Sequence, residues 1–128
     1  MKTVETEIEG TIFKVQEGLS FTQQSMIIGI MEEHINIDEL YKLQDQDELS
    51  IESIKPIIKK GKSLIEFNYA IMKYLLTNIV VEPNITDEML DDPDDPNALS
   101  YLLLGTKLSE LALIYLGRMN LLKKTPKS

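Results

Sequence analysis

The sequence contains no cysteine, no tryptophan and a single histidine, His34. The lack of cysteine excludes a disulfide framework and any zinc site built on thiolates. Any Ser–His–Asp arrangement would have to use His34, and no partner that would activate a nucleophile is recognisable beside it. His34 follows Ile30 and Met31 at helical spacing. We therefore interpret it as a structural residue in an apolar stripe or at its edge.

Basic residues are scarce. The 128 residues include 13 bases and 21 acids, which gives a net charge of −8. Residues 81–98 carry seven acids and no base, whereas bases outnumber acids from Leu99 onward. An acidic chain repels phosphate backbones, which argues against a nucleic-acid partner. Solubility alone accounts for such a charge, and the alternative interpretation is an acidic surface that meets a basic partner.

Long hydrophobic runs and glycine-rich loops are also missing. No stretch of about 18 uninterrupted apolar residues is present, so we predict no membrane-spanning helix. Residues 1–10 alternate acids with apolar side chains, so we expect no signal peptide. The six glycines form no phosphate-binding loop.

The acidic residues follow no cation-binding or catalytic pattern. Residues 91–97 (DDPDDPN) have adjacent acids, two prolines and no glycine, unlike an EF-hand loop. In each of the pairs Glu32–Glu33 and Asp38–Glu39, the two adjacent side chains point in different directions. Two catalytic carboxylates would instead face each other across a cleft. We therefore predict no catalytic residue, no metal, no cofactor and no enzymatic activity.

The chain begins with a segment of β-forming residues. Residues 3–16 predict a short β-hairpin with its turn at Glu9–Gly10. A two-stranded hairpin is marginally stable alone, so this one must pack on helices or on another chain.

Helix signals follow the hairpin. Ser20 and Gln23 form a capping-box pattern that predicts a helix over residues 21–35. Asp38 is expected to cap a short helix over residues 38–43.

Proline and glycine divide the next region. Because proline inside a helix removes a hydrogen bond, Pro56 predicts two short pieces or a kink between residues 50 and 60, ended by Gly61. Two long helices then follow, over residues 63–80 and 96–116, and both are apolar around most of their circumference.

These elements predict a mainly α protein: a compact helical domain of about four to six helices with a small N-terminal β-hairpin. We expect one domain over residues 1–128. Within it, residues 1–18 are the hairpin-like lead, residues 19–117 the helical body, and residues 118–128 a flexible basic tail.

The last helix has more apolar surface than one core needs. One broad face is predicted to be core and holds Tyr101, Leu104, Leu108, Leu111, Ala112 and Tyr115. A second face carries small Gly105 and Ser109, which could form a dimer contact or accept another helix of the same chain. A third, polar strip with Ser100, Lys107, Glu110 and Arg118 is interrupted by leucine and isoleucine. The candidate partner-binding residues on the second and third faces are Leu102, Leu103, Leu113, Ile114 and Leu116.

Asn68 is an amide inside the apolar helix over residues 63–80. Two interpretations stay open for it, a hydrogen-bonded core amide or an organiser of a site.

Three features together resemble the tail assembly chaperones of long-tailed bacteriophages. The first is an extended lead into GLSFTQQSMIIGIMEE, with a Leu-Ser-Phe motif before a helix. The second is an apolar helix that runs into NIVVEPNITDEML, where a proline and an acidic turn follow. The third is an Asp-Pro start to a last long apolar helix. The resemblance covers about residues 10–117.

The resemblance implies a non-catalytic protein in the bacterial host cytoplasm. Such a chaperone binds the long, helical, apolar tape-measure protein and keeps it soluble until tail-tube subunits polymerise around it. The family also often makes a longer, frameshifted form of the chain. Lys123–Lys124 stands where a slippery codon pair would lie, although a plain basic tail is the favoured interpretation of these lysines. We expect the partner to be a protein and not nucleic acid or a membrane. Whether the chain also forms a homo-oligomer stays open.

Two other classes of function remain. One is a small acidic adaptor or regulatory domain that sequesters a basic partner, with salt-sensitive binding. The other is an enzyme with substrate-assisted chemistry, which needs a polar pocket that no cluster in the sequence would line.

Overall fold

The structure is a computed structural model that describes residues 1–42 and 51–118. The described part is mainly helical, with six α-helices and a small antiparallel sheet. Residues 43–50 and the predicted basic tail beyond Arg118 lie outside the described residues. The predicted fold class is confirmed at this level, but the sheet is larger than the hairpin alone.

The hairpin forms where it was predicted. Strands β1 (Thr3–Ile8) and β2 (Thr11–Gln16) pair antiparallel, with Ile8 opposite Thr11. The two residues between them, Glu9 and Gly10, have φ values of 50° and 79°. Positive φ at both positions is the geometry of a type I′ turn, whose twist matches that of the strands.

A third strand replaces the predicted end of the first long helix. Helix α4 (Leu64–Asn78) ends two residues before the predicted Val80, and β3 (Val80–Glu82) pairs antiparallel with β2. The Gln16 amide donates to the Ile79 carbonyl at 2.9 Å. Ile79, Val80 and Val81 are β-branched and fit a strand better than a helix. The prediction of a helix to Val80 was therefore wrong.

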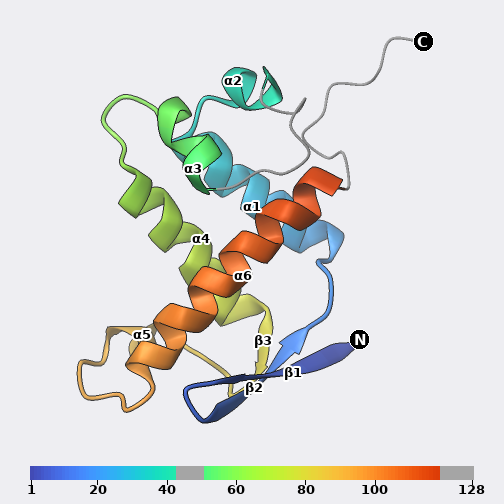
Figure 1. Cartoon of the computed structure of the whole chain (residues 1–128), viewed down its shortest axis with the longest axis vertical. Coiled ribbons are helices and arrows are strands. Elements are labelled where there is room, and N and C mark those ends of the chain that lie inside the picture. Colours follow the sequence, from blue (N-terminus) through green and yellow to red (C-terminus); the bar gives the residue numbers. More distant parts are fainter. Residues whose placement is uncertain (43–50, 119–128) are drawn as a thin grey trace.

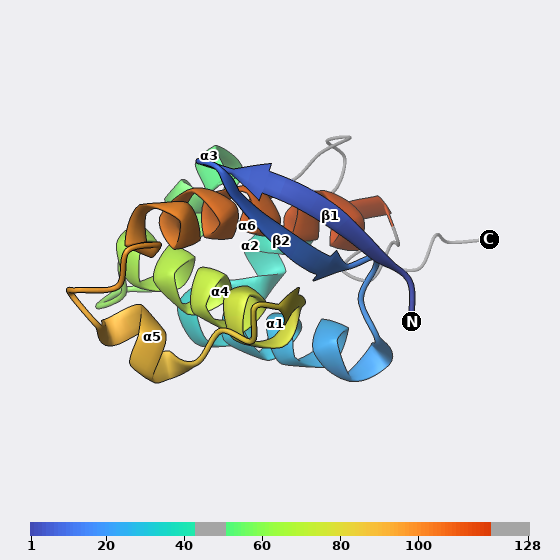
Figure 2. The same ribbon diagram turned by 90° about the horizontal axis from the view of Figure 1, so that it is seen from below.

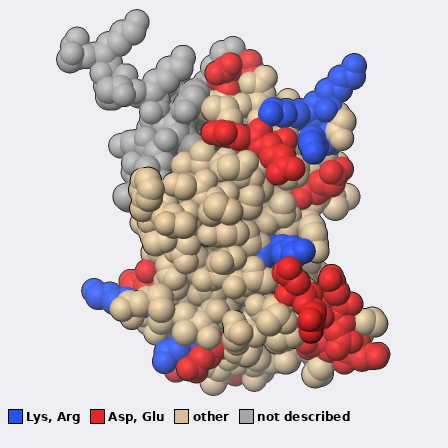
Figure 3. Space-filling view, turned by 180° about the vertical axis from the view of Figure 1, so that it is seen from behind, with Lys and Arg blue, Asp and Glu red and all other residues tan. Residues whose placement is uncertain are grey.

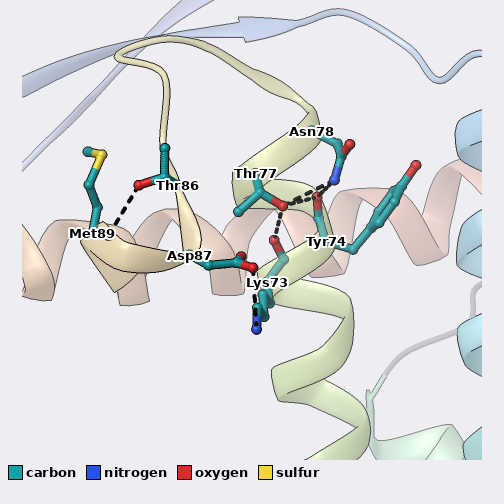
Figure 4. A network of polar contacts seen from close by, with 7 residues as sticks. All are labelled: Lys73, Tyr74, Thr77, Asn78, Thr86, Asp87 and Met89. Atoms are coloured by element: carbon teal, nitrogen blue, oxygen red, sulfur yellow. Dashed lines mark hydrogen bonds and ion pairs between the residues drawn. The ribbon is translucent and has the colours of Figure 1, made fainter. Parts of the chain in front are cut away.

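Polar side chains stabilise the end of α4 (Figure 4). The Thr77 hydroxyl donates to the Lys73 carbonyl at 2.8 Å, and the Asn78 amide donates to the Tyr74 carbonyl at 2.9 Å. Each bond is a second one to a carbonyl that also accepts from the helix amide four residues on, a local side-chain-to-backbone bond typical of threonine and asparagine. Beyond the strand, the Thr86 hydroxyl caps α5 (Asp87–Asp91) by accepting from the Met89 amide at 3.2 Å.

The first helices also follow local signals. Helix α1 (Phe21–His34) starts with both bonds of the Ser20–Gln23 capping box. Helix α2 (Ile37–Lys42) is capped by Asn36, whose side-chain oxygen accepts from the amides of Asp38 and Glu39. The predicted cap at Asp38 was wrong, because Asp38 already lies in the first turn.

The region around Pro56 forms two short pieces, as predicted. Helix α3 (Ile51–Ile54) is followed by the 3₁₀ helix η2 (Lys55–Ile57) with Pro56 in its first turn, where proline is tolerated. Gly61 then takes a φ of 84°.

The last helix, α6 (Ala98–Arg118), starts two residues after Pro96. The Asp95 carboxylate holds this start, because it accepts from the Asn97 amide at 2.8 Å and from the Tyr101 hydroxyl at 3.1 Å. Residues 98–115 are long and apolar enough to cross a membrane by length and composition, which the prediction of no spanning helix did not allow for. In the molecule, 44% of that stretch is buried, so one such helix is weak evidence for a membrane span.

The helices form layers around α4. Helix α6 crosses α4 on one side and α1 packs on the other, as Figures 1 and 2 show from two directions. The sheet lies across one end of α4 and α6, with β1 at its outer margin (Figure 2). The core between these layers includes Phe13, Ile27, Met31, Phe67, Ile71, Leu75, Leu104 and Leu113.

Candidate protein-binding surface

The small-residue face of α6 is occupied by α4 of the same chain. A Cβ atom on Gly105 would lie 3.2 Å from Leu76 Cδ1 and 3.3 Å from Met72 Cβ, so the two helices approach closely there. One turn further, the Ser109 hydroxyl donates to Asn68 Oδ1 at 3.3 Å. This contact places Gly105 and Ser109 inside the molecule rather than in a dimer interface. Asn68 is the half-buried, hydrogen-bonded amide of the first interpretation.

The outward side of α6 carries an exposed row of leucines. Leu102 is 55% exposed and Leu103 is 40% exposed. Leu111, which was predicted to be core, is 51% exposed because the sheet does not cover it. Among these leucines lie only three exposed polar side chains, those of Thr106, Lys107 and Glu110. We call this the leucine surface; its members are Leu99, Leu102, Leu103 and Leu111.

The structure separates the five candidate partner-binding residues. Leu102 and Leu103 lie on the leucine surface. Leu113 is only 1% exposed and belongs to the core, so it offers no surface to a partner. Ile114 is half-buried and lines a groove beside the hairpin, and the side chain of Leu116 lies outside the described part.

Ser100 also differs from its predicted place in an exposed polar strip. It is buried, and its hydroxyl donates to the Ile8 carbonyl at 3.4 Å. This bond joins the start of α6 to the end of β1.

The groove beside the hairpin has a volume of about 320 Å³. It runs between the hairpin and the C-terminal half of α6, and we call it the hairpin groove. The groove is open to solvent on the side of β1. Val4 of β1 lies on the same face of the sheet as buried Phe13 and Val15, yet it is 46% exposed. Sequence reasoning missed this groove, since only the packing of the hairpin on α6 creates it. Its apolar lining includes Val4, Val15, Leu104, Leu108, Leu111 and Ile114.

The rear of the molecule has a broad uncharged area (Figure 3). Helix α1 contains no charged residue from Phe21 to Met31, and Phe21 and Met26 are exposed. Acidic side chains gather at the margin of this area, around α5. The molecule therefore combines exposed apolar side chains with a charged rim.

The acidic region around α5 contacts α4 through one ion pair. Lys73 Nζ lies 3.9 Å from Asp87 Oδ2 (Figure 4). The same atom lies 5.8 Å from the centre of the Tyr69 ring. The side chain of Asp87 is 66% exposed and that of Lys73 is 37% exposed, so solvent screens the pair and it contributes little to stability. Within residues 1–42 and 51–118, no group of three or more His, Asp and Glu residues is placed to hold a metal ion.

The single histidine has a structural environment, as predicted. His34 is buried, and its Nδ1 atom lies 2.9 Å from the Ile30 carbonyl oxygen, to which it donates. Its ring packs edge-on against Phe67, with the ring centres 6.0 Å apart.

Two tyrosines have shifted ionisation. Burial raises the pKa of the Tyr101 hydroxyl above its ordinary value of 10.0, and the hydrogen bond to Asp95 raises it further. Burial also raises the pKa of Tyr74. Both pKa values are raised further above pH 7, so the two phenol groups stay protonated under physiological conditions.

Comparisons with known proteins give no guide to function, so the leucine surface and the hairpin groove are the main evidence. No protein-family model, no curated protein and no solved structure matches this chain.

Proposed function

We propose that this protein is a tail assembly chaperone of a long-tailed bacteriophage or prophage, which binds the tape-measure protein and keeps it soluble. The single observation that carries the proposal is the leucine surface of α6. Leu102 and Leu103 are neighbours, are 55% and 40% exposed, and stand on a helix whose other side is already packed in the core.

Such a surface suits a helical, apolar partner. Contiguous exposed apolar side chains on a folded protein mark interaction sites more often than isolated ones do. Exposed leucines on one helix present ridges that can pack into the grooves of a second helix. A tape-measure protein with apolar helical stripes would bury those stripes against Leu99, Leu102 and Leu103. The net charge of −8 would keep the complex soluble.

The test is a pull-down of the tagged protein from cells that produce the source phage or prophage, with mass spectrometry of the bound chains. We expect recovery of a very long helical tail protein by the wild type and its loss with the double variant Leu102→Asp/Leu103→Asp. Ile65→Asp is the matched control, because it places the same charge on an exposed apolar position of α4. Recovery of the same long protein by the double variant would contradict the assigned surface.

A second candidate function is supported by the acidic region around α5. Asp91, Asp92 and Asp94 are exposed, and no base lies between residues 81 and 98. An acidic adaptor would sequester a basic partner through these residues. Its binding would weaken at high salt, since exposed charges are screened over about 8 Å at physiological ionic strength. Loss of all bound chains at high salt, with only a small basic protein recovered at low salt, would favour this candidate over the chaperone.

A further inference from the structure

Strand β1 has an unpaired edge. The strand order is β1-β2-β3, so β1 has β2 on one side and no strand of the described chain on the other (Figure 2). Residues opposite each other in an antiparallel pair alternate between hydrogen-bonded and non-hydrogen-bonded positions. The two-residue turn makes Ile8 and Thr11 a hydrogen-bonded pair.

This alternation fixes which backbone groups are free. The Lys2 carbonyl accepts from the Glu17 amide at 2.9 Å, which continues the bonded positions at every second residue from Ile8. The amide and carbonyl groups of Thr3, Glu5 and Glu7 therefore point away from β2. An edge of this kind is a template for an added strand.

The side chains along this edge define what kind of strand fits. On the outer face of the sheet, the register aligns Glu5, Lys14 and Glu82 across the three strands. This row alternates acid, base and acid, so the next position beyond Glu5 favours a base. Glu7 follows on the same face, opposite Ile12.

The inner face of the same edge opens on the hairpin groove. Val4 and Thr6 from β1 line the groove, together with half-exposed Leu111 of α6. Alternate side chains of a strand point to opposite faces. An added strand would therefore place one set of side chains over the groove and the other set beside Glu5 and Glu7.

From this edge and groove we infer that β1 binds an extended segment of a partner protein in which lysine or arginine alternates with apolar residues. The basic side chains lie beside Glu5 and Glu7, and the apolar ones cover Val4 and Leu111. A second copy of this chain does not fit, because pairing β1 with another β1 brings acids of like charge together. This site is separate from the leucine residues Leu102 and Leu103 and does not depend on the proposed chaperone function.

The test uses a synthetic peptide of about seven residues that alternates lysine and valine, with a peptide that alternates glutamate and valine as its control. Binding is followed by nuclear magnetic resonance of the full chain. We expect the lysine peptide to slow hydrogen exchange at the amides of Thr3, Glu5 and Glu7, and the glutamate peptide to have no effect.

A matched pair of variants separates the strand edge from simple charge attraction. Glu5→Pro removes the outward amide without removing a hairpin bond, and proline is tolerated at such an edge position. Glu5→Thr removes the same charge but keeps the amide. We expect Glu5→Pro to bind about tenfold more weakly than Glu5→Thr, the effect of one lost hydrogen bond.

Several results would overturn the inference. They are equal binding by the two variants, equal binding of the glutamate peptide, or no protection at the three amides when the lysine peptide is in excess. Dimerisation of the wild type that Glu5→Pro abolishes would assign the edge to a second copy instead. Leu102→Asp/Leu103→Asp should leave peptide binding unchanged, so a failure here is distinguishable from a failure of the chaperone proposal.

Discussion

At the residue scale, Tyr101 joins three parts of the molecule. Its ring packs edge-on against Phe13 of β2, with centres 6.3 Å apart, while its hydroxyl donates to Asp95 before α6. The side chain is buried. One residue thus connects the sheet, the last helix and the loop that follows α5.

Tyr101→Phe tests this connection. The variant keeps the ring contact with Phe13 but loses the bond to Asp95, so we expect the free energy of unfolding to fall by about 1 kcal/mol. Urea unfolding at neutral pH measures it. Tyr69→Phe, at an exposed position on α4, is the control and should change the stability little.

The raised pKa of Tyr101 also predicts a pH dependence. Its pKa in the folded state lies above the ordinary value of 10.0 that it has in the unfolded chain. Its contribution to stability is therefore fully present below pH 10 and is lost as the pH rises through the folded-state pKa. Urea unfolding at increasing alkaline pH should show a steeper loss for the wild type than for Tyr101→Phe. Equal slopes would mean that Tyr101 is not the titrating group.

Leu103 and Leu113 lie on the same helix, the first on its exposed side and the second in the core. Leu113→Ala removes a buried side chain and should cost about 2–5 kcal/mol of the free energy of unfolding. Leu103→Ala should cost clearly less than Leu113→Ala, since 40% of Leu103 is exposed. Thermal unfolding of both variants checks the assignment, and a large loss for Leu103→Ala would show that it is packed inside.

At the element scale, the close crossing of α4 and α6 depends on a glycine, Gly105, at the point of contact. Gly105→Leu would force side-chain atoms against Met72 and Leu76, and we expect a loss of about 1–3 kcal/mol. Gly29 of α1 provides the contrast, because nothing lies within 4 Å of a Cβ placed there. Gly29→Ala should raise the free energy of unfolding by about 0.8–1 kcal/mol through helix propensity. A gain in stability for Gly105→Leu would contradict the close crossing.

The elements that sequence reasoning predicted are those with local causes. The Glu9–Gly10 turn, the Ser20–Gln23 capping box and the break at Pro56 each depend on residues a few positions apart. Strand β3 was missed because its apolar residues continue the pattern of α4, and only pairing with distant β2 reveals a strand. Local patterns do not contain that pairing.

The candidate site was predictable only in part, for a similar reason. Helical spacing separated Leu102 and Leu103 from the core face, but it placed Leu111 in the core and Leu113 among the partner-binding residues. Which leucines are covered depends on where α4 and the hairpin pack. Neither position can be read from the spacing along one helix.

At the scale of the whole molecule, exposed apolar side chains coexist with a strong negative charge. The leucine surface is apolar and the rear area is uncharged, while acids gather around α5 (Figure 3). Burial of apolar surface is not screened by salt, whereas attraction between exposed charges is. Binding of the tape-measure protein should therefore survive an increase from 0.15 to about 1 M salt, where the screening length falls to about 3 Å. Titration of the complex with salt measures this, and dissociation at moderate salt would favour the acidic adaptor.

We propose that the leucine surface keeps an apolar helical partner in solution. The most direct measurement is the soluble fraction of the tape-measure protein from the same genome, co-expressed with the wild type, with Leu102→Asp/Leu103→Asp, or with the control Ile65→Asp. The account predicts a soluble tape-measure protein with the wild type and the control, and an aggregated one with the double variant. A tape-measure protein that is equally insoluble with all three, or equally soluble without any of them, would contradict it.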